Sequence, residues 1–228
     1  SYAFFDYRAG LKLLDTPFVG FKYFRALVAN PVLVGEMLRV LRNTFAISIL
    51  GLLASPLPVI FAILLTEVHS DGYRKVVQTL TTIPHFISWI LVYSVIWAMF
   101  SVSDGFLNRF LLYLGVIDKG VNYLASDNGV WFQMLGYQIW KTLGWSAILY
   151  LAAIAGIDPE LYQAATVDGA GRFRLIRHIT LPGVIPTYFV LLLFTIANFI
   201  NNGLEQYFVF QNPMNKAQIE VLDLYVYN

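Results

Sequence analysis

The 228-residue sequence lacks cysteine and is poor in charged side chains. Without cysteine there can be no disulfide and no thiolate metal site. Charged residues make up 13% of the chain, against ~25% in typical soluble domains, and 58% of the residues are hydrophobic. The net charge is +1, whereas nucleic-acid-binding domains are usually strongly basic. The composition therefore indicates a membrane protein and argues against a nucleic-acid partner.

Several enzyme motifs are also missing. The sequence contains no G-x-x-x-x-G-K-[ST] phosphate-binding loop, no H-E-x-x-H zinc motif and no G-x-S-x-G nucleophile elbow. The histidines His69, His85 and His178 are far apart in sequence. These absences argue against an ATPase, a zinc enzyme and an intramembrane protease. We therefore expect a chain that is not an enzyme and that carries no cofactor or metal of its own.

Uncharged runs long enough to cross a bilayer, which takes ~20 residues, recur along the chain. Spanning helices are expected at Asn43–Thr66, at Val76–Ser103, at roughly Val130–Ile157 and at roughly Gly183–Asn202. The first run contains Pro56 and Pro58, where we expect a kink. Residues 1–39 mix charges with aromatic side chains, which is typical of a membrane–water interface.

The longest polar insert lies between the third and fourth runs. Asp158 is a good N-cap, and Pro159 fits the first position of a helix. Gly169 is expected to end this helix, because glycine adopts the left-handed conformation at little cost. A basic helical turn follows over Arg172–Ile179, and Leu181-Pro182 is expected to stop it before the next span. On these features alone, a merely solvated loop is an equally good interpretation.

The spacing within this insert resembles a known motif. From Gln163 the pattern reads Gln-Ala-Ala, three residues, Gly169, nine residues, Ile179, one residue and Leu181-Pro182. It is similar to the "EAA" loop of permease subunits of binding-protein-dependent ABC importers, and its flanks resemble the sugar-importer branch. Gln163 stands where the family carries an acid, and we expect the docking to survive this change.

The resemblance extends over nearly the whole chain. Phe4–Tyr7, Phe18–Phe24 and Arg42-Asn43-Thr44 look like the stretch after the first helix of these permeases. Ile139–Trp145 and Ile148–Ala153 resemble the polysaccharide-permease subgroup, whose relatives include importers of uronic-acid oligosaccharides.

The resemblance implies an all-α polytopic membrane protein with the type I ABC importer permease fold. Such subunits usually have six or more helices, so the chain is expected to be a piece with about four spanning helices that lacks the first and the last. Residues 1–39 and 205–228 would be external segments, and residues 40–204 the transmembrane core, with a cytoplasmic coupling loop at 157–182. The expected location is the bacterial cell (inner) membrane, crossed several times.

In the family this loop fits a cleft on the ATPase. The coupling positions carried over are Tyr162, Gln163, Ala164, Ala165, Asp168, Gly169, Leu181 and Pro182. The implied partners are a second homologous permease subunit, two ABC ATPase subunits that bind ATP and Mg, a solute-binding protein, membrane lipid and an oligosaccharide substrate.

Polar side chains inside the last two expected spans are candidates for the substrate path, because polar groups are costly at membrane depth. Lys141 is the clearest, and it must face a water-filled cavity or a partner. Helical offsets place Gln138, Lys141, Thr142 and Trp145 on one face, and Thr195, Asn198, Phe199 and Asn202 recur at similar offsets in the next span. The resemblance aligns both faces with the sugar contacts of the maltose importer's larger permease. The alternative is hydrogen bonding between helices.

Three questions stay open at this point. If Lys141 pairs with a substrate carboxylate, an acidic oligosaccharide is favoured; if it holds a helix contact, a neutral sugar fits as well. A permease of the same family for peptides or amino acids shares the loop. An ion-coupled secondary transporter usually needs acidic residues or broken helices at the midplane, and no Asp or Glu lies inside an expected span.

Overall fold

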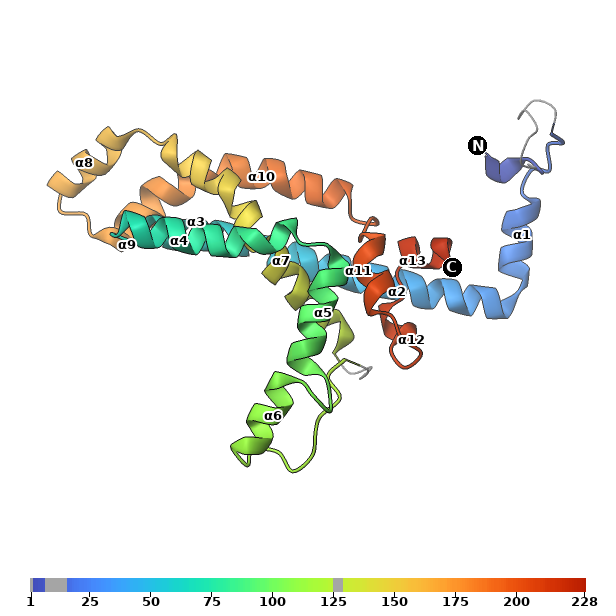
Figure 1. Cartoon of the computed structure of the whole chain (residues 1–228). Helices are drawn as coiled ribbons and strands as arrows, with labels where there is room; N and C mark the ends of the chain where they lie inside the picture. The colour runs from blue at the N-terminus through green and yellow to red at the C-terminus, as the bar shows by residue number, and fades with distance from the viewer. Residues whose placement is uncertain (1, 7–15, 125–128) are drawn as a thin grey trace. The chain divides into compact units, whose positions relative to one another are not determined.

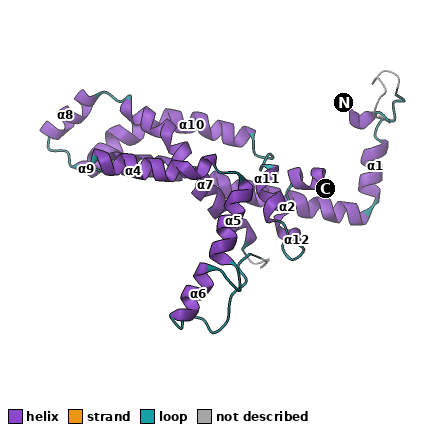
Figure 2. Cartoon of the chain, in the orientation of Figure 1, coloured by secondary structure: helices purple, strands orange, loops and turns teal. Residues whose placement is uncertain are grey.

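A computed structural model describes residues 2–6, 16–124 and 129–228. The prediction of an all-α chain is confirmed: over these residues the secondary structure is helical, apart from an isolated bridge between Phe5 and Phe18 (Figure 2). The chain divides into two compact units, residues 1–42 and 43–228.

The first unit holds a cluster of aromatic side chains. It comprises η1 (Tyr2–Phe4), α1 (Lys22–Ala29) and the start of α2 (Pro31–Ala54). The Phe4 ring lies 5.5 Å from the rings of both Phe21 and Phe24. The Tyr23 hydroxyl donates to the Asp6 carboxylate at 2.7 Å. These contacts explain how a segment so rich in aromatics and charges forms a local fold.

The second unit is built around α7. After the end of α2 it contains α3 (Leu57–Thr66), α4 (Asp71–Thr82), η3 (Ile83–Phe86), α5 (Trp89–Phe100), α6 (Phe106–Tyr113), α7 (Val130–Ala155), α8 (Pro159–Val167), α9 (Arg172–Leu175), the π-helical turn η4 (Ile176–Thr180), α10 (Leu181–Ala197), α11 (Leu204–Phe210), α12 (Lys216–Ile219) and α13 (Leu222–Tyr227). Helices α3, α4 and α10 all pack against α7, and Figure 1 shows α8 beyond their ends. Two buried apolar clusters, one around Val92 and Tyr207 and one around Ala147 and Val184, form the core.

Two helical stretches in the described part of the chain are long and apolar enough to cross a membrane. They are Pro31–Thr66, which is interrupted at Ser55 and Pro56, and Arg172–Ala197. Up to four spans result if each bent pair of helices counts as one: Asp71–Phe86 with Trp89–Phe100, bent by 111°, and Val130–Ala155 with Pro159–Val167, bent by 67°. The prediction of one continuous span over Val76–Ser103 is therefore wrong. Pro84 lies in the 3-10 helix η3 just before the bend, and Ser88 caps the new helix by accepting from the Leu91 amide at 3.4 Å.

The two proline sites behave differently. The helix is interrupted at the predicted site near Pro56, because α2 ends at Ala54 and α3 begins at Leu57. The predicted stop at Leu181-Pro182 is wrong, since the helix runs unbroken from Arg172 to Ala197. The π-helical turn directly before Pro182 widens the backbone, which accommodates a residue that has no N–H to donate. The fourth span thus begins and ends earlier than the predicted Gly183–Asn202.

Gly144 sets the closest approach of α7 to its neighbours. A Cβ atom at this position would lie 2.4 Å from the carbonyl carbon and oxygen of Thr81 and 2.7 Å from the Thr82 nitrogen. Backbone meets backbone here, so a side chain of any size requires the two helices to move apart.

We expect Gly144→Ala to destabilise the protein by about 1–3 kcal/mol, the usual cost of overpacking a tight contact. Gly136→Ala is the matched control in the same helix, because nothing lies within 4 Å of a Cβ there and alanine favours a helix by ~1 kcal/mol over glycine. Thermal melting of the detergent-purified variants measures the difference. Equal melting temperatures for the two variants would contradict the close approach.

Candidate functional site

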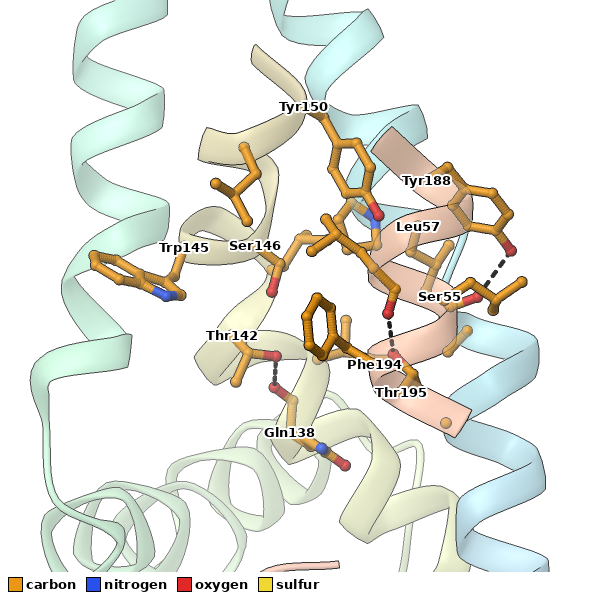
Figure 3. Close-up of a pocket in the computed structure, with 18 of the residues that line it drawn as sticks. Ser55, Leu57, Gln138, Thr142, Trp145, Ser146, Tyr150, Tyr188, Phe194 and Thr195 are labelled. Carbon is orange, nitrogen blue, oxygen red and sulfur yellow. Dashed lines mark hydrogen bonds between the residues drawn. The ribbon is translucent and has the colours of Figure 1, made fainter. Parts of the chain in front are cut away.

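A cavity of about 470 Å³ lies between the end of α2, α3, α7 and α10. Its polar lining residues are Ser55, Gln138, Thr142, Ser146, Tyr150, Tyr188, Thr195 and Asn198 (Figure 3). Aliphatic and aromatic side chains complete the wall. Within the described residues, no charged side chain lines the cavity. Such a site can offer hydroxyl and amide groups to a neutral or hydroxyl-rich molecule.

The lining hydroxyls are already oriented by the helices that carry them. The Thr142 hydroxyl donates to the Gln138 carbonyl at 2.8 Å, and the Thr195 hydroxyl donates to the Leu191 carbonyl at 3.0 Å. Ser55 lies at the break between α2 and α3, and its hydroxyl is 3.0 Å from that of Tyr188. Because each Ser or Thr oxygen can still accept a hydrogen bond, the cavity wall presents hydrogen-bond acceptors at fixed positions to a bound molecule.

Lys141, the clearest candidate in the sequence, lies outside this cavity. Its side chain is 8% exposed, and its ammonium group donates to the carbonyls of Pro84, His85 and Ile87 at 3.2, 2.8 and 2.6 Å. Of the two environments predicted for Lys141, the structure shows the protein partner rather than the cavity. The predicted shared face is thus divided, and only its Gln138 and Thr142 side opens fully to the cavity.

Trp145 lies between the side of α7 that faces the cavity and the side that carries Lys141. It belongs to the cavity lining, but Figure 3 shows its indole turned away from the other labelled side chains. The ring stacks on His85 with a centroid distance of 4.5 Å and an interplanar angle of 1°. One face of the indole is therefore covered by His85, while the residue remains 45% exposed.

Phe199 and Asn202 do not share a helical face with Thr195, because α10 ends at Ala197. The Phe199 ring packs against Phe45 at 5.7 Å. The Ser48 hydroxyl contacts the Phe199 carbonyl and lies 3.1 Å from the Asn202 side-chain oxygen. Neither residue lines the cavity. The prediction of a single polar face over this span holds for Thr195 and Asn198, which both line the cavity, and is wrong from Phe199 onward, where the chain turns.

Sequence reasoning assigned no structural role to a buried polar pair outside the cavity and did not name two polar residues that line the cavity. Asn43 donates to the carbonyls of Ala217 and Glu220 at 3.0 Å each, and the Thr44 hydroxyl accepts from the Leu222 amide at 2.9 Å. This buried pair anchors the C-terminal segment. In the sequence it stood out as part of the family resemblance and as a polar pair at the start of an apolar run, but neither signal predicted this contact. In the cavity, Ser146 and Tyr150 follow Thr142 at intervals of four residues, a spacing that places them on one helix face.

The polar insert forms a helix with defined ends. The Asp158 carboxylate caps α8 by accepting from the Glu160 amide at 2.9 Å. Gly169 has φ +77°, and the Ala170 amide donates to the Ala165 carbonyl at 2.9 Å, a bond typical of a glycine-terminated helix. Both predicted ends of this helix are confirmed. None of its residues is buried, so α8 presents its surface to another molecule or to water.

Two contacts tie α8 and its turns to the helices that line the cavity. The Tyr162 hydroxyl lies 3.0 Å from the hydroxyl of Thr180, which is buried just before α10. Ile157, in the turn between α7 and α8, packs so closely on Gly183 that a Cβ there would lie 2.5 Å from the Ile157 side chain. The insert is therefore linked firmly to both α7 and α10.

A helical membrane chain with a polar cavity and an exposed, capped helix joined to the cavity walls has the architecture of a transport subunit. The profile of the family described as "Binding-protein-dependent transport system inner membrane component" matches residues 54–228. The chain belongs to this family, and it is a membrane-embedded transport component.

Two bacterial relatives align with almost the whole chain. It is 40% identical to protein LplB of Bacillus subtilis (strain 168), over 99% of this chain and 69% of LplB. It is 38% identical to the polygalacturonan/rhamnogalacturonan transport system permease protein YteP of the same organism, over 99% of this chain and 68% of YteP.

Solved structures share the fold as well. A bacterial ABC transporter involved in the import of the acidic polysaccharide alginate matches with a TM-score of 0.85 and 35% identity, over 94% of this chain and 73% of that chain. A bacterial alginate ABC transporter in complex with an alginate pentasaccharide-bound periplasmic protein matches with a TM-score of 0.84 and 36% identity, over 91% and 70%. The predicted ABC importer permease fold is thereby confirmed.

We expect Gly169→Ala to weaken the response of the assembled transporter's ATPase to its binding protein. An L-residue in the left-handed conformation costs about 1–2 kcal/mol, so the end of α8 loosens. Gly171→Ala is the control, because Gly171 has φ −76° and nothing lies within 4 Å of a Cβ there. If both variants respond like the parent, the left-handed end of α8 is not needed for coupling.

Proposed function

We propose that this chain is a permease subunit of an ATP-driven importer and forms half of the translocation pathway for an oligosaccharide. The observation that carries the proposal is the family match over residues 54–228, which include the capped α8 helix and all the residues that line the cavity except Gly51. In this proposal the subunit crosses the bacterial inner membrane several times. It assembles with a second homologous permease, two ABC ATPase subunits and an extracytoplasmic solute-binding protein.

The connections of α8 support a coupling role for residues 157–182. Only Gly156, Ile157 and Asp158 separate α7 from α8, and the Tyr162–Thr180 contact joins α8 to the start of α10. When ATP closes the two nucleotide-binding subunits, a dock on α8 moves both cavity walls together. The cavity then opens alternately to the two sides of the membrane. ATP and Mg reside on the partner ATPase, and this chain supplies the motion and the path.

The chemistry of the cavity supports a sugar as the substrate. Gln138, Thr142 and Thr195 offer amide and hydroxyl groups, and within the described residues the Gln138 side-chain amide has no hydrogen-bond partner. Carbohydrates bind through such groups set between apolar surfaces. Relatives named for polygalacturonan/rhamnogalacturonan and for alginate support an oligosaccharide that contains uronic acid. Its carboxylates would accept from the Gln138 side-chain amide, since the Thr142 and Thr195 hydroxyls donate to their own helices and Lys141 is engaged elsewhere.

Reconstitution of the complete transporter in liposomes tests the substrate class. The binding protein is loaded in turn with oligogalacturonates, with neutral oligosaccharides of equal length and with peptides. We expect the acidic oligosaccharides to stimulate ATP hydrolysis most, and unloaded binding protein to serve as the baseline.

Each other outcome revises a different part of the proposal. Stimulation by peptides alone would overturn the sugar assignment in favour of the peptide-importer alternative. Equal stimulation by neutral and acidic oligosaccharides would remove the uronic-acid requirement. Uptake driven by an ion gradient without ATP would favour a secondary transporter.

A further inference from the structure

Lys141 binds the backbone at the sharper of the two bends between paired helices, 111° against 67°. The helix formed by α4 and η3 ends at Phe86, and α5 leaves it at 111°. Carbonyls at the end of a helix lack their usual donors and carry the negative end of the helix dipole. The oxygens of Pro84, His85 and Ile87 converge here on the Lys141 ammonium at 3.2, 2.8 and 2.6 Å. The Pro84 carbonyl also accepts from the Ile87 amide at 3.2 Å, so the His85 and Ile87 carbonyls are the ones that depend on Lys141.

This set of bonds uses the full capacity of the ammonium group. A lysine ammonium has three N–H donors and no acceptor, and each donor has a carbonyl partner. The nitrogen also lies 5.5 Å from the centre of the Trp89 ring, which adds a cation–π contact. Lys141 therefore has no donor left for a substrate group while this bend is intact.

Two further residues of α7 contact the segment that forms the bend. Gly144, one turn after Lys141, meets the backbone of Thr81 and Thr82 directly. Trp145 stacks on His85 at 4.5 Å. Lys141, Gly144 and Trp145 thus contact the same segment in three different ways, through charge, close approach and ring stacking.

We propose that the Lys141 ammonium is a tethered cation that occupies a built-in monovalent-cation site at the bend between η3 and α5. Freed carbonyls of broken helices coordinate Na⁺ in ion-coupled transporters, and here a covalently attached ammonium takes that position. The bend therefore needs no diffusible ion. Removing the lysine side chain is expected to leave an empty site that ammonium-like cations can fill. This inference goes beyond the proposed function and holds whatever the substrate is.

Hydrogen exchange of the assembled transporter, read by mass spectrometry over residues 83–91, tests the proposal without any transport assay. In Lys141→Ala we expect exchange in this segment to rise about tenfold or more, because the buried carbonyls lose their donors. Methylammonium chloride should restore the protection. Tetramethylammonium chloride at equal concentration should not, since it has no N–H donor.

Two variants serve as controls. Lys141→Met removes the charge but fills the space, so its faster exchange should not respond to methylammonium. Lys119→Ala removes an exposed lysine in another loop and should exchange like the parent. If Lys141→Ala does not assemble, the proposal predicts that methylammonium during purification restores assembly on size-exclusion chromatography.

Several results would overturn the tethered-cation proposal. One is unchanged exchange over residues 83–91 in Lys141→Ala. Another is restoration by methylammonium and tetramethylammonium to the same extent, and a third is failure of methylammonium to recover either protection or assembly. None of these results depends on whether the chain transports a sugar, so they leave the proposed function to its own test.

Discussion

Inside a membrane every backbone carbonyl freed by a helix break needs a donor, because no water is present to supply one. Two helix breaks in this chain lie beside α7, and α7 supplies the hydrogen-bond donors at the break between η3 and α5. At the 111° bend the donors come from Lys141, and Gly144 lets the two backbones meet. The milder break between α2 and α3 instead leaves Ser55 facing Tyr188 in the cavity. The positions of α3, α4 and α5 thus depend on one central helix.

The same helix connects the cavity to the exposed α8 helix. One side of α7 contacts the bend between η3 and α5, and the adjacent side places Gln138 and Thr142 in the cavity wall. The end of α7 is joined to α8 by a short turn. The Tyr162–Thr180 contact gives α8 a second attachment, to the start of α10. A force applied to α8 therefore reaches two walls of the cavity at once. This arrangement gives the proposed coupling a physical route that needs no flexible linker.

The sequence predicted the α8 helix well because its ends are determined locally, by the Asp158 cap and by Gly169. The prediction from the sequence was wrong where contacts with residues far away in the chain determine the structure. Hydropathy cannot distinguish a straight span from the 111° bend at Phe86, whose donors lie on Lys141, 54 to 57 residues away in the chain. Helical offsets likewise assumed that α10 continues past Ala197, so Phe199 and Asn202 were grouped with Thr195. Within the cavity, Gln138 and Thr142 were recognisable as polar groups in an apolar run, whereas Ser55 was hidden beside the proline kink.

Docking of α8 on a partner ATPase can be tested directly, because the sequence has no cysteine. A single Gln163→Cys substitution on the exposed surface of α8 carries a thiol-reactive photocrosslinker, and Val116→Cys, 64% exposed in another loop, serves as the control. After illumination of the assembled transporter, we expect a covalent product between this chain and the ATPase from Gln163→Cys alone, with a yield that changes when ATP is added. Absence of that product, or equal yields from the two positions, would show that α8 does not dock on the ATPase.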